Sequence, residues 1–386
     1  MLPSDKYNAL DNDLYKFTMQ QAVLHKYPDA RVKYRFKLRN PEMVNQIDRA
    51  SWFRDISTEI DRFCDIRFTD NDLSYLRSIR FMKPDYIDFL EDFTFKRRYI
   101  DLKMNSDALP EITIEGPWVQ TILFEVPLLY IVSETYSQKR TTVWNTLPFI
   151  KETVSELSEY SFPYADFGTR RRFSWTHHYL LIEQLAKTDA LVGTSNVLLA
   201  KQFGLKPIGT MAHEWLQAHQ ALFRVQDSQK EALDAWASEY RGDLGIALSD
   251  VVGFNAFLED FDLYFSKLFD GCRHDSGDPF EWCDKLIQHY EMLGINPKTK
   301  IAVFSDGLDF KKANDLYVQY KDQINVSFGI GTHLTNRCDF TPLQIVLKMV
   351  ECNGKPVAKI SDSSGKGMCE DDNYLDYLKY VFNIGE

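Results

Sequence analysis

The chain contains 386 residues, of which 45 are basic and 56 are acidic, so its formal net charge at pH 7 is −11. This acidic balance disfavours generic nucleic-acid binding, which requires a basic surface. Hydrophobic residues make up 44% of the chain, as in soluble globular proteins, and the length allows a large core and two lobes. An anionic substrate would therefore require a local cluster of arginines, lysines and helix amino termini.

The amino-terminal residues and the cysteines bear on the cellular compartment. Residues 1–20 show no basic region followed by an apolar run, so we expect no signal peptide. No stretch approaches the ~18 apolar residues of a membrane helix, so we expect no membrane partner. The six cysteines have neither CxxC pairing nor zinc-finger spacing. A reduced, cytoplasmic enzyme fits this pattern best.

The first 140 residues predict an amino-terminal α+β lobe. After an exposed start, Asp13 is placed to cap a helix with a broad apolar face. The strict alternation of RVKYRFKLR is typical of a half-buried strand. In chain order we expect a helix, a strand, several helices, two strands and further helices, within residues 1–30, 31–39, 43–98, 99–116 and 117–160.

From about residue 161 the pattern changes to alternating strands and helices. Seven β-like runs each end in a polar or glycine-rich turn, over residues 163–169, 190–195, 206–210, 243–250, 267–278, 300–307 and 325–332. Helical stretches lie between them, including a long one over about 213–240. The alternation predicts either an α/β barrel or a doubly wound sheet, within residues 141–340.

The last part of the chain, from about residue 341, returns to strands. LQIVLKMVE and KPVAKIS flank the dipeptide Asn353-Gly354, which is a hairpin signal. We therefore expect residues 341–386 to go back to the first lobe and complete it.

The stretch KPIGTMAHEW, residues 206–215, places a histidine at the expected start of a helix. His213 on its own would more often be a surface or structural residue. Other strands in this region are also followed by polar turns, however, and parallel strands bring such turns to one rim, where α/β barrels carry their chemistry. His213 is therefore a candidate catalytic residue.

Two further turns are rich in charge. DFGTRRR, residues 166–172, puts three arginines at an expected helix amino terminus, where a bound anion would relieve them, although a solvated basic helix start is the alternative. RHDSGDP, residues 273–279, offers acids for ribose hydroxyls or for Mg²⁺ carried by a diphosphate, although a capped turn is the alternative. Asp250, Asp306 and the GIGT turn at 329–332 each fit an ordinary turn when taken singly.

Eight motifs, in order, together resemble the nicotinate phosphoribosyltransferase family in its bacterial form: DLYKFTM (13–19), DFGTRRR (166–172), LVGTSN (191–196), GTMAHEW (209–215), SD (249–250), RHDSGDP (273–279), FSDG (304–307) and FGIGT (328–332). The resemblance runs over nearly the whole chain. It implies that nicotinate and 5-phosphoribosyl 1-diphosphate give nicotinate mononucleotide and diphosphate, in NAD salvage. It also implies Mg²⁺ and a ligase-type coupling to ATP hydrolysis through a phosphohistidine.

The resemblance further implies an architecture that the motifs alone do not contain. It is the irregular, TIM-like α/β barrel of the type II phosphoribosyltransferases, with a second α+β lobe built from both chain ends. The family resemblance also implies a homodimer, in which each active site borrows residues from the neighbouring subunit.

Carried over residue by residue, the resemblance implies that ATP phosphorylates His213, with Asp250 and Asp275 as further catalytic residues. Phe167 and Tyr15 would stack on the two faces of the pyridine ring, with Tyr15 supplied by the neighbouring subunit. We also expect Asp250 to hold the second ring nitrogen of His213. Nicotinate contacts would come from Tyr15, Phe167, Arg170, Ser195 and Arg273, and phosphoribosyl and phosphate contacts from Arg273, Asp275, Asp306, Gly307, Gly331 and Thr332.

Ser195 bears on the choice of acceptor. The similar nicotinamide phosphoribosyltransferase looks acidic at this position, and an acid there would repel a carboxylate substrate, to which serine can instead donate a hydrogen bond. A nicotinamide-specific enzyme is therefore one alternative that Ser195 speaks against. A catalytically inactive barrel that acts as a binding protein is another, and the intact His213, Asp250 and Arg273 speak against it.

Overall fold

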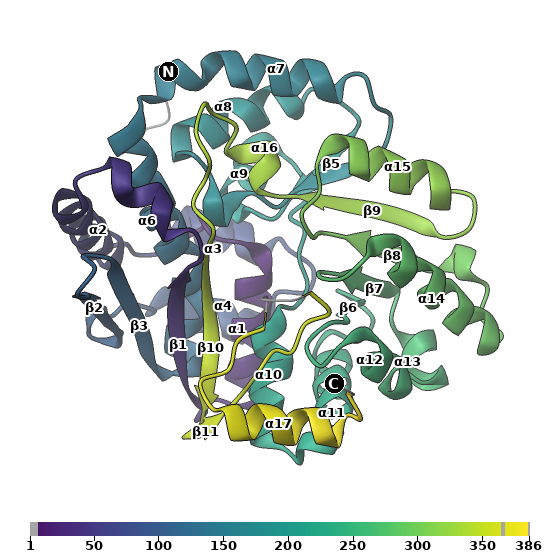
Figure 1. Cartoon of the computed structure of the whole chain (residues 1–386). Helices are drawn as coiled ribbons and strands as arrows, with labels where there is room; N and C mark the ends of the chain where they lie inside the picture. Colours follow the sequence, from purple (N-terminus) through teal and green to yellow (C-terminus); the bar gives the residue numbers. More distant parts are fainter. Residues whose placement is uncertain (1–6, 364–366, 385–386) are drawn as a thin grey trace.

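The structure, a computed structural model, describes residues 7–363 and 367–384. A parallel sheet and an antiparallel sheet lie beside each other, with helices around them (Figure 1). The predicted exposed start and parts of the predicted range 341–386 fall on residues 1–6, 364–366 and 385–386, which lie outside the described residues.

The parallel sheet is formed by six of the seven runs predicted to be strands. Its strands are β4 (Tyr164–Asp166), β5 (Leu191–Thr194), β6 (Ile246–Leu248), β7 (Gly271–His274), β8 (Ile301–Phe304) and β9 (Asn325–Ile330). They lie in the order β5-β4-β9-β8-β7-β6, and each neighbouring pair is parallel. Because all the strands point the same way, the turns that follow them lie at one edge of the sheet.

The prediction of a strand over 206–210 is wrong. Pro207 forms only an isolated parallel bridge with Thr194 at the end of β5, since proline has no N–H to extend a ladder. The segment nevertheless reaches the opposite edge strand, because the Thr210 hydroxyl donates to the Ile246 carbonyl of β6 over 3.1 Å. Residues 206–210 therefore lie between the two edge strands of the parallel sheet.

The antiparallel sheet contains strands from both ends of the chain. Its strands are β1 (Arg31–Leu38), β2 (Ile100–Met104), β3 (Pro110–Pro117), β10 (Ile345–Cys352) and β11 (Lys355–Pro356), in the order β11-β10-β1-β3-β2. The hairpin predicted at Asn353-Gly354 is confirmed, because these residues join β10 to β11 with φ values of 49° and 74°. Strand β10 pairs with β1, so the carboxyl-terminal hairpin lies in the same sheet as the amino-terminal strands.

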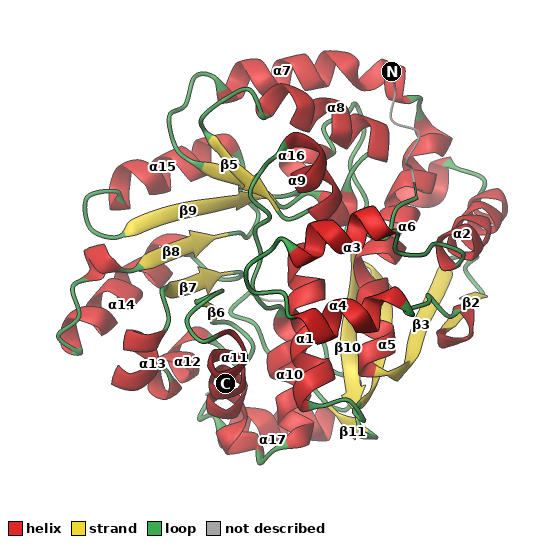
Figure 2. Cartoon of the chain, turned by 180° about the vertical axis from the view of Figure 1, so that it is seen from behind, coloured by secondary structure: helices red, strands yellow, loops and turns green. Residues whose placement is uncertain are grey.

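The helices before the parallel sheet are α1 (Leu14–Lys26), α2 (Arg49–Cys64), α3 (Asp70–Arg77), α4 (Pro84–Glu91), α5 (Trp118–Thr121), α6 (Glu125–Arg140) and α7 (Leu147–Leu157). Short 3-10 helices precede or join them at Pro41–Gln46, Arg97–Tyr99, Ile122–Phe124 and Val143–Thr146. Of the helices before the parallel sheet, α5 and α6 pack against the antiparallel sheet, whereas α7 packs on the helix over Trp175–Leu185. In the projection of Figure 2, α1, α3 and α4 lie between the two sheets.

Helices of the parallel-sheet region alternate with its strands as predicted. They are α8 (Trp175–Leu185), α9 (Val197–Phe203), α10 (His213–Leu222), α11 (Ser228–Tyr240), α12 (Phe254–Asp260), α13 (Leu263–Leu268), α14 (Pro279–Met292), α15 (Phe310–Tyr320) and α16 (Thr332–Thr335), followed after the hairpin by α17 (Asp372–Val381). The long helix predicted over 213–240 is broken between α10 and α11. Short 3-10 helices lie at Thr169–Arg171, Val225–Asp227 and Pro297–Thr299.

A buried ion cluster fixes the residues before α1 against the turn after β4. The Arg172 guanidinium, which is inaccessible to solvent, donates to both carboxylate oxygens of Asp11 and to Glu134, each over 2.7 Å. Breaking one partner of such a buried group costs about 3–5 kcal/mol, because the remaining charge stays buried. The cluster therefore holds the start of α1 close to the DFGTRRR turn.

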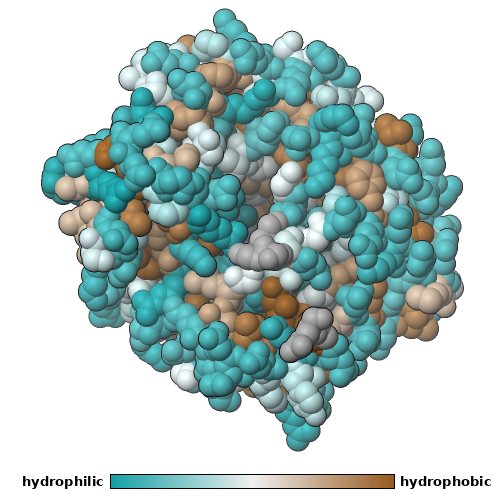
Figure 3. All heavy atoms as spheres, in the orientation of Figure 1, coloured by the Kyte–Doolittle hydropathy of each residue, from teal (hydrophilic) through white to brown (hydrophobic). Residues whose placement is uncertain are grey.

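The hydrophilic surface agrees with the proportion of charged residues in the chain, and the cysteines are free thiols, as their spacing predicted. On the face shown in Figure 3, hydrophilic residues predominate and apolar residues form small patches. All six cysteines lie in the described part of the chain, and none forms a disulfide. No helix within residues 7–363 and 367–384 is both long and apolar enough to cross a membrane.

Candidate active site

His213 begins helix α10, and two strand-end carboxylates face its Nε2 atom. Asp250 follows β6 and places Oδ1 2.9 Å from Nε2, while Asp275 follows β7 and places Oδ2 3.4 Å from it. The Ser276 hydroxyl donates to the other Asp250 oxygen over 2.6 Å. The structure thus brings together the three residues predicted to be catalytic, and it places Asp250 where it can orient the imidazole.

Lys359 is a fourth member of this group that the sequence analysis missed. Its Nζ atom lies 2.6 Å from His213 Nε2 and 2.6 Å from Asp250 Oδ2, and the side chain is buried. Two hydrogen bonds hold the segment around it: Ile360 N–H donates to the Val251 carbonyl over 2.8 Å, and Gln220 accepts from Ala358 N–H over 2.9 Å. The sequence KPVAKIS indicated only a strand of the hairpin, and no residue near Lys359 indicated that this lysine belongs to the active site.

The charges around His213 set its protonation state. Burial, together with the Lys359 ammonium, lowers the pKa of the His213 imidazole despite its carboxylate neighbours. Burial alone would raise the pKa of the Asp250 carboxyl, but the His213 imidazole and the Lys359 ammonium outweigh it and hold that pKa well below its ordinary value. Near neutral pH the group therefore combines an uncharged imidazole with an ionised carboxylate.

Arg273 holds the Asp275 carboxylate from the other side. Its Nη2 atom lies 2.9 Å from Asp275 Oδ1, and its Nε donates to the Ser305 hydroxyl over 2.8 Å. Ser305 in turn donates to Asp275 Oδ1 over 3.0 Å. Burial opposes ionisation of Asp275, but Arg273 and His213 keep its pKa below the ordinary range. These bonds fix the orientation of Arg273 at the rim of the parallel sheet.

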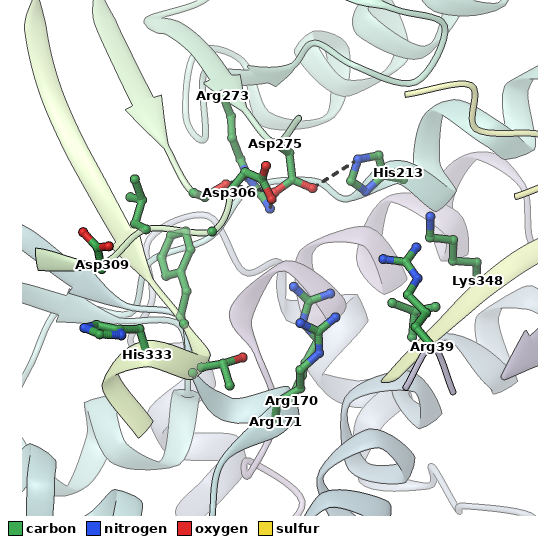
Figure 4. Close-up of a pocket in the computed structure, with 18 of the residues that line it drawn as sticks. Arg39, Arg170, Arg171, His213, Arg273, Asp275, Asp306, Asp309, His333 and Lys348 are labelled. Carbon is green, nitrogen blue, oxygen red and sulfur yellow. Dashed lines mark hydrogen bonds and ion pairs between the residues drawn. The ribbon is translucent and has the colours of Figure 1, made fainter. Parts of the chain in front are cut away.

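A cavity of about 490 Å³ opens beside these residues and is walled by both sheets (Figure 4). The turns after β8 and β9 contribute residues predicted to bind phosphate, Asp306, Gly307, Gly331 and Thr332. The lining also contains cations that the sequence analysis did not single out as site residues: Arg171 lies in the turn after β4, and Arg39 and Lys348 lie on the side of the antiparallel sheet (Figure 4). We call this space the cationic cavity. Despite the net charge of −11, the chain thus forms the local basic cluster that an anionic substrate requires.

Lys348 lies on β10 of the antiparallel sheet and points into the cationic cavity (Figure 4). Burial, with further contributions from the cations Lys359 and Arg39, lowers the pKa of Lys348 to about 7. The charge of this wall therefore changes within the physiological pH range.

A second cavity, of about 450 Å³, lies inside the parallel sheet. Every strand of that sheet, or the turn after it, contributes to its lining, through Phe167, Val192, Ile246, Arg273, Ile301 and Ser327 among others. Because all of its strands contribute to the lining, the sheet curves around this space. We call this space the ring cavity. Phe167, Arg170 and Arg273 line both cavities, so the two spaces meet at these three side chains.

The residues predicted to bind the pyridine ring meet in the ring cavity. Phe167, Tyr15, Arg170 and Ser195 all line it. Gly329 on β9 makes room for the aromatic ring of Phe167, because a Cβ atom at this glycine would lie 2.2 Å from that ring. The structure thus places an aromatic pair, an arginine and a serine around one space.

Tyr15 belongs to the same chain as the other lining residues, which differs from the expectation that a neighbouring subunit supplies it. Tyr15 is the second residue of α1, and the Leu14 N–H before it donates to the Ser195 carbonyl over 2.8 Å. This bond draws the start of α1 onto the end of β5. Among the described residues the buried Tyr15 hydroxyl has no hydrogen-bond partner.

A buried network links the starts of three helices to Arg170, which lines both cavities. Lys16 of α1 lies between the carboxylates of Glu125 at the start of α6 and Glu214 in the first turn of α10. Tyr34 of β1 donates to the second oxygen of Glu214. Arg170 approaches the second oxygen of Glu125 at 3.6 Å. The network holds Arg170 and the residue next to His213 in a fixed relation.

Two further histidines, His178 and His333, differ in their surroundings. His178 lies 2.7 Å from Asp166, which also accepts from Thr194 over 2.6 Å, so the carboxylate at the end of β4 is held from two sides. His333, by contrast, lies in the lining of the cationic cavity.

Two matches cover most of the chain. Residues 162–386 match the nicotinate phosphoribosyltransferase (NAPRTase) family, and residues 10–133 match the N-terminal domain of that family. The chain belongs to the nicotinate phosphoribosyltransferase family. The resemblance inferred from the eight motifs is thereby confirmed.

Curated relatives and solved structures agree with this membership. Nicotinate phosphoribosyltransferase of Xylella fastidiosa (strain Temecula1 / ATCC 700964) is 54% identical over 389 residues, 98% of each chain. That of Ralstonia pickettii (strain 12J) is 50% identical and covers 98% of this chain and 99% of the relative. The crystal structure of nicotinate phosphoribosyltransferase from Vibrio cholerae aligns with a TM-score of 0.93 at 38% identity, over 100% of this chain and 97% of that one. The structure from Porphyromonas gingivalis gives 0.92 at 31% identity, over 98% and 100%.

The donor atoms of His213, Asp250 and Asp275 lie within 4.8 Å of one another, as ligands of a metal ion would. The Lys359 ammonium, however, already lies 2.6 Å from both His213 and Asp250. A lysine cation in this position compensates the carboxylates and blocks an approaching metal ion. The group therefore does not fit a resident metal.

Proposed function

We propose that this chain transfers the phosphoribosyl group of 5-phosphoribosyl 1-diphosphate to nicotinate and forms nicotinate mononucleotide and diphosphate, in NAD salvage. The observation that carries the proposal is the junction of an aromatic ring cavity with a cationic cavity at Phe167, Arg170 and Arg273. The first suits a pyridine carboxylate and the second suits a polyphosphate. The shared name of the relatives supports the same reaction.

The chemistry requires positioning and charge stabilisation more than a general base. The pyridine nitrogen attacks with its own lone pair, so no proton has to leave the nucleophile. As the C1–O bond breaks, positive charge develops on the ribose and negative charge on the leaving diphosphate. Arg39, Arg171 and Lys348 would stabilise the leaving group, and Asp275 and Asp306 would face the ribose. Mg²⁺ would enter bound to the diphosphate, as part of the substrate.

ATP would act as a co-substrate that phosphorylates His213. Within the described residues the polar contacts of this imidazole involve Nε2, which leaves Nδ1 as the nitrogen for the phosphoryl group. In the tautomer whose Nε2–H donates to Asp250, the Nδ1 lone pair would attack the γ-phosphorus of ATP, ADP would leave, and Asp250 would take up the Nε2 proton. The low pKa of His213 favours the neutral, nucleophilic form. The amino terminus of the ten-residue helix α10 favours the added negative charge. The phosphohistidine would then couple ATP hydrolysis to tighter substrate binding, as in a ligase.

The architecture and setting inferred from the resemblance are proposals of the same kind. The curved parallel sheet, with residues 206–210 between its edges, would be the irregular TIM-like barrel of residues 141–340. The sheet that joins β1 to β10 would be the core of the second lobe. We place the enzyme in the cytoplasm. The resemblance also implied a homodimer with shared sites; we propose the homodimer but build each site within one chain, because Tyr15 lies in the ring cavity of its own chain.

The decisive experiment measures nicotinate mononucleotide formation with and without ATP, and with nicotinamide in place of nicotinate. Wild-type protein should use nicotinate, respond to ATP and carry an acid-labile label from γ-labelled ATP. His213→Ala should lose the label and the ATP response but keep some ATP-independent synthesis. The control is His25→Ala, whose side chain lies outside both cavities. No product from either pyridine, or label on a residue other than His213, contradicts the proposal.

A further inference from the structure

Asp13 occupies the N-cap position of α1, yet its carboxylate makes no capping hydrogen bond, contrary to the sequence-based prediction. It instead accepts the Ser195 hydroxyl over 2.7 Å. Asp13 is 2% and Ser195 4% exposed, and both line the ring cavity. A carboxylate normally satisfies a backbone N–H at this position and gains about 1 kcal/mol by doing so. Asp13 lacks this capping hydrogen bond and instead accepts the Ser195 hydroxyl in the ring cavity.

This hydrogen bond creates a conflict with a carboxylate substrate. A serine hydroxyl has one hydrogen, and in the free site Asp13 accepts it. Ser195 then presents only lone pairs to the cavity, which would repel nicotinate. A carboxamide would not meet this difficulty, because its N–H₂ group can donate to Ser195 or to Asp13.

The charges around Asp13 make the conflict sharper. The ionisable groups that face it are Arg170, Asp166 and Tyr15, and Thr169 and Ser195 are its neutral neighbours. Asp166 is paired with His178 at 2.7 Å. Arg170 also approaches Glu125 at 3.6 Å, but Lys16 already pairs with that carboxylate. Arg170 is therefore the cation beside Asp13 that would have to serve both Asp13 and the substrate carboxylate. Two carboxylates in one low-dielectric site do not both stay ionised when their countercharge is insufficient.

We propose that Asp13 is a specificity-determining residue that takes up one proton from solvent when nicotinate binds. This inference rests on the proposed function. The protonated Asp13 donates to Ser195 Oγ, and the Ser195 hydrogen turns to the nicotinate carboxylate. The two hydrogen bonds keep one hydrogen each, and the site gains one positive charge as the substrate brings one negative charge. Burial raises the pKa of the Asp13 carboxyl, which agrees with a low cost of protonation.

The proposal distinguishes nicotinate from nicotinamide by pH. Nicotinate binds with a proton, so its affinity falls up to tenfold per pH unit above the pKa of Asp13 in the free site. Nicotinamide needs no proton, so its affinity has no such dependence. His213 and Lys348 line the cationic cavity and not the ring cavity, so neither contacts the space in which the pyridine would bind.

The test is titration calorimetry of the full chain with nicotinate at pH 8, in two buffers that differ in ionisation enthalpy. The difference in heat should correspond to uptake of about one proton by the wild type. Asp13→Asn, which mimics the protonated acid, should bind nicotinate without proton uptake and with an affinity independent of pH. The matched control Asp371→Asn changes the N-cap residue of α17, outside both cavities, and should behave as wild type.

The pH dependence of the nicotinate KM gives a second readout that needs no variant, and folding of Asp13→Asn is checked by thermal unfolding. Nicotinate binding by the wild type without proton uptake overturns the proposal, as does unchanged uptake in a folded Asp13→Asn. Failure of the wild type to bind or use nicotinate at all overturns the proposed function instead, so the two failures are distinguishable.

Discussion

The Lys359 ammonium lies 2.6 Å from the Nε2 atom of His213, although 146 positions separate the two residues in the chain. The same ammonium contacts Asp250, so a cation, an imidazole and a carboxylate share one buried site. This arrangement suits an imidazole that is phosphorylated on its other nitrogen. The cation lowers the pKa of the ring before the reaction and can compensate the negative charge that arrives with the phosphoryl group.

Lys359→Met should impair phosphorylation of His213 more than phosphoribosyl transfer. Loss of a buried cation that stabilises developing negative charge lowers the rate by about 100-fold or more. We expect this loss in the rate of labelling by γ-labelled ATP, whereas ATP-independent synthesis should fall much less. The control is Lys379→Met, since that lysine is 43% exposed and lies 4.0 Å from Asp376. Equal losses in both rates would show that Lys359 has only a structural role.

Ser195→Asp should discriminate strongly against nicotinate. The new carboxylate would lie beside Asp13, which is 2.7 Å from the present hydroxyl, and would add a second negative charge where the substrate carboxylate binds. The KM for nicotinate should rise about 100-fold, while that for nicotinamide changes less, because a charge pair in such a site contributes about 2–3 kcal/mol. Ser195→Asn is the neutral control of similar size. An unchanged ratio of the two KM values would remove Ser195 from the substrate contacts.

Tyr15→Ala and His213→Ala variants should not restore each other's activity when they are mixed. Tyr15 and Phe167 line one cavity of one chain, so each chain in the mixture would lack one component of its own site. Tyr15→Ala alone should raise the KM for nicotinate about tenfold through loss of ring stacking, worth about 0.5–1.5 kcal/mol beyond its buried area. Recovery of activity in the mixture, with subunit exchange verified, would establish a shared site and restore the dimer expected from the resemblance.

Binding of 5-phosphoribosyl 1-diphosphate should weaken as the pH rises through the pKa of Lys348, about 7. Lys348 is charged below this pH and neutral above it, so one cation of the cavity is lost. We expect the KM to rise about tenfold between pH 6 and 8.5, the effect of one charged hydrogen bond of about 1.5 kcal/mol. Lys348→Arg should flatten the profile, because arginine stays charged. A flat wild-type profile would contradict the assignment.

Lys348 should also affect the stability of the folded chain, and this effect should increase with pH, whereas substrate binding should weaken. The pKa of lysine in the unfolded chain is about 10.4, so between pH 7 and 10 the unfolded chain binds more protons at this position than the folded one. The Lys348 contribution to the free energy of unfolding therefore increases with pH over this window. Denaturant titrations of wild type and Lys348→Met at pH 7 and 9.5 should show the difference between the two proteins change in that direction.

The sequence by itself determined the elements that depend on local pattern. Strict alternation predicted β1, and Asn353-Gly354 predicted the β10–β11 hairpin, since these signals lie within one element and its turn. Six strand-turn units were predicted correctly for the same reason. Asp250 and Asp275 follow β6 and β7, and the turns after parallel strands meet at one edge wherever the strands lie in the chain, while the catalytic roles of these residues and of His213 came from the family resemblance. The seventh unit failed as a strand because Pro207 cannot continue a ladder.

Only the tertiary structure decided which distant groups complete the site. Lys359, Lys348 and Arg39 reach the cationic cavity from the hairpin and the antiparallel sheet, and no pattern near them in sequence carries that information. Asp13 was predicted to cap its helix, but the end of β5 offered a side-chain donor that only the fold brings within reach. Contacts between segments separated by more than a hundred residues depend on how the sheets pack together, and local periodicity reports burial and turn geometry without naming the partner.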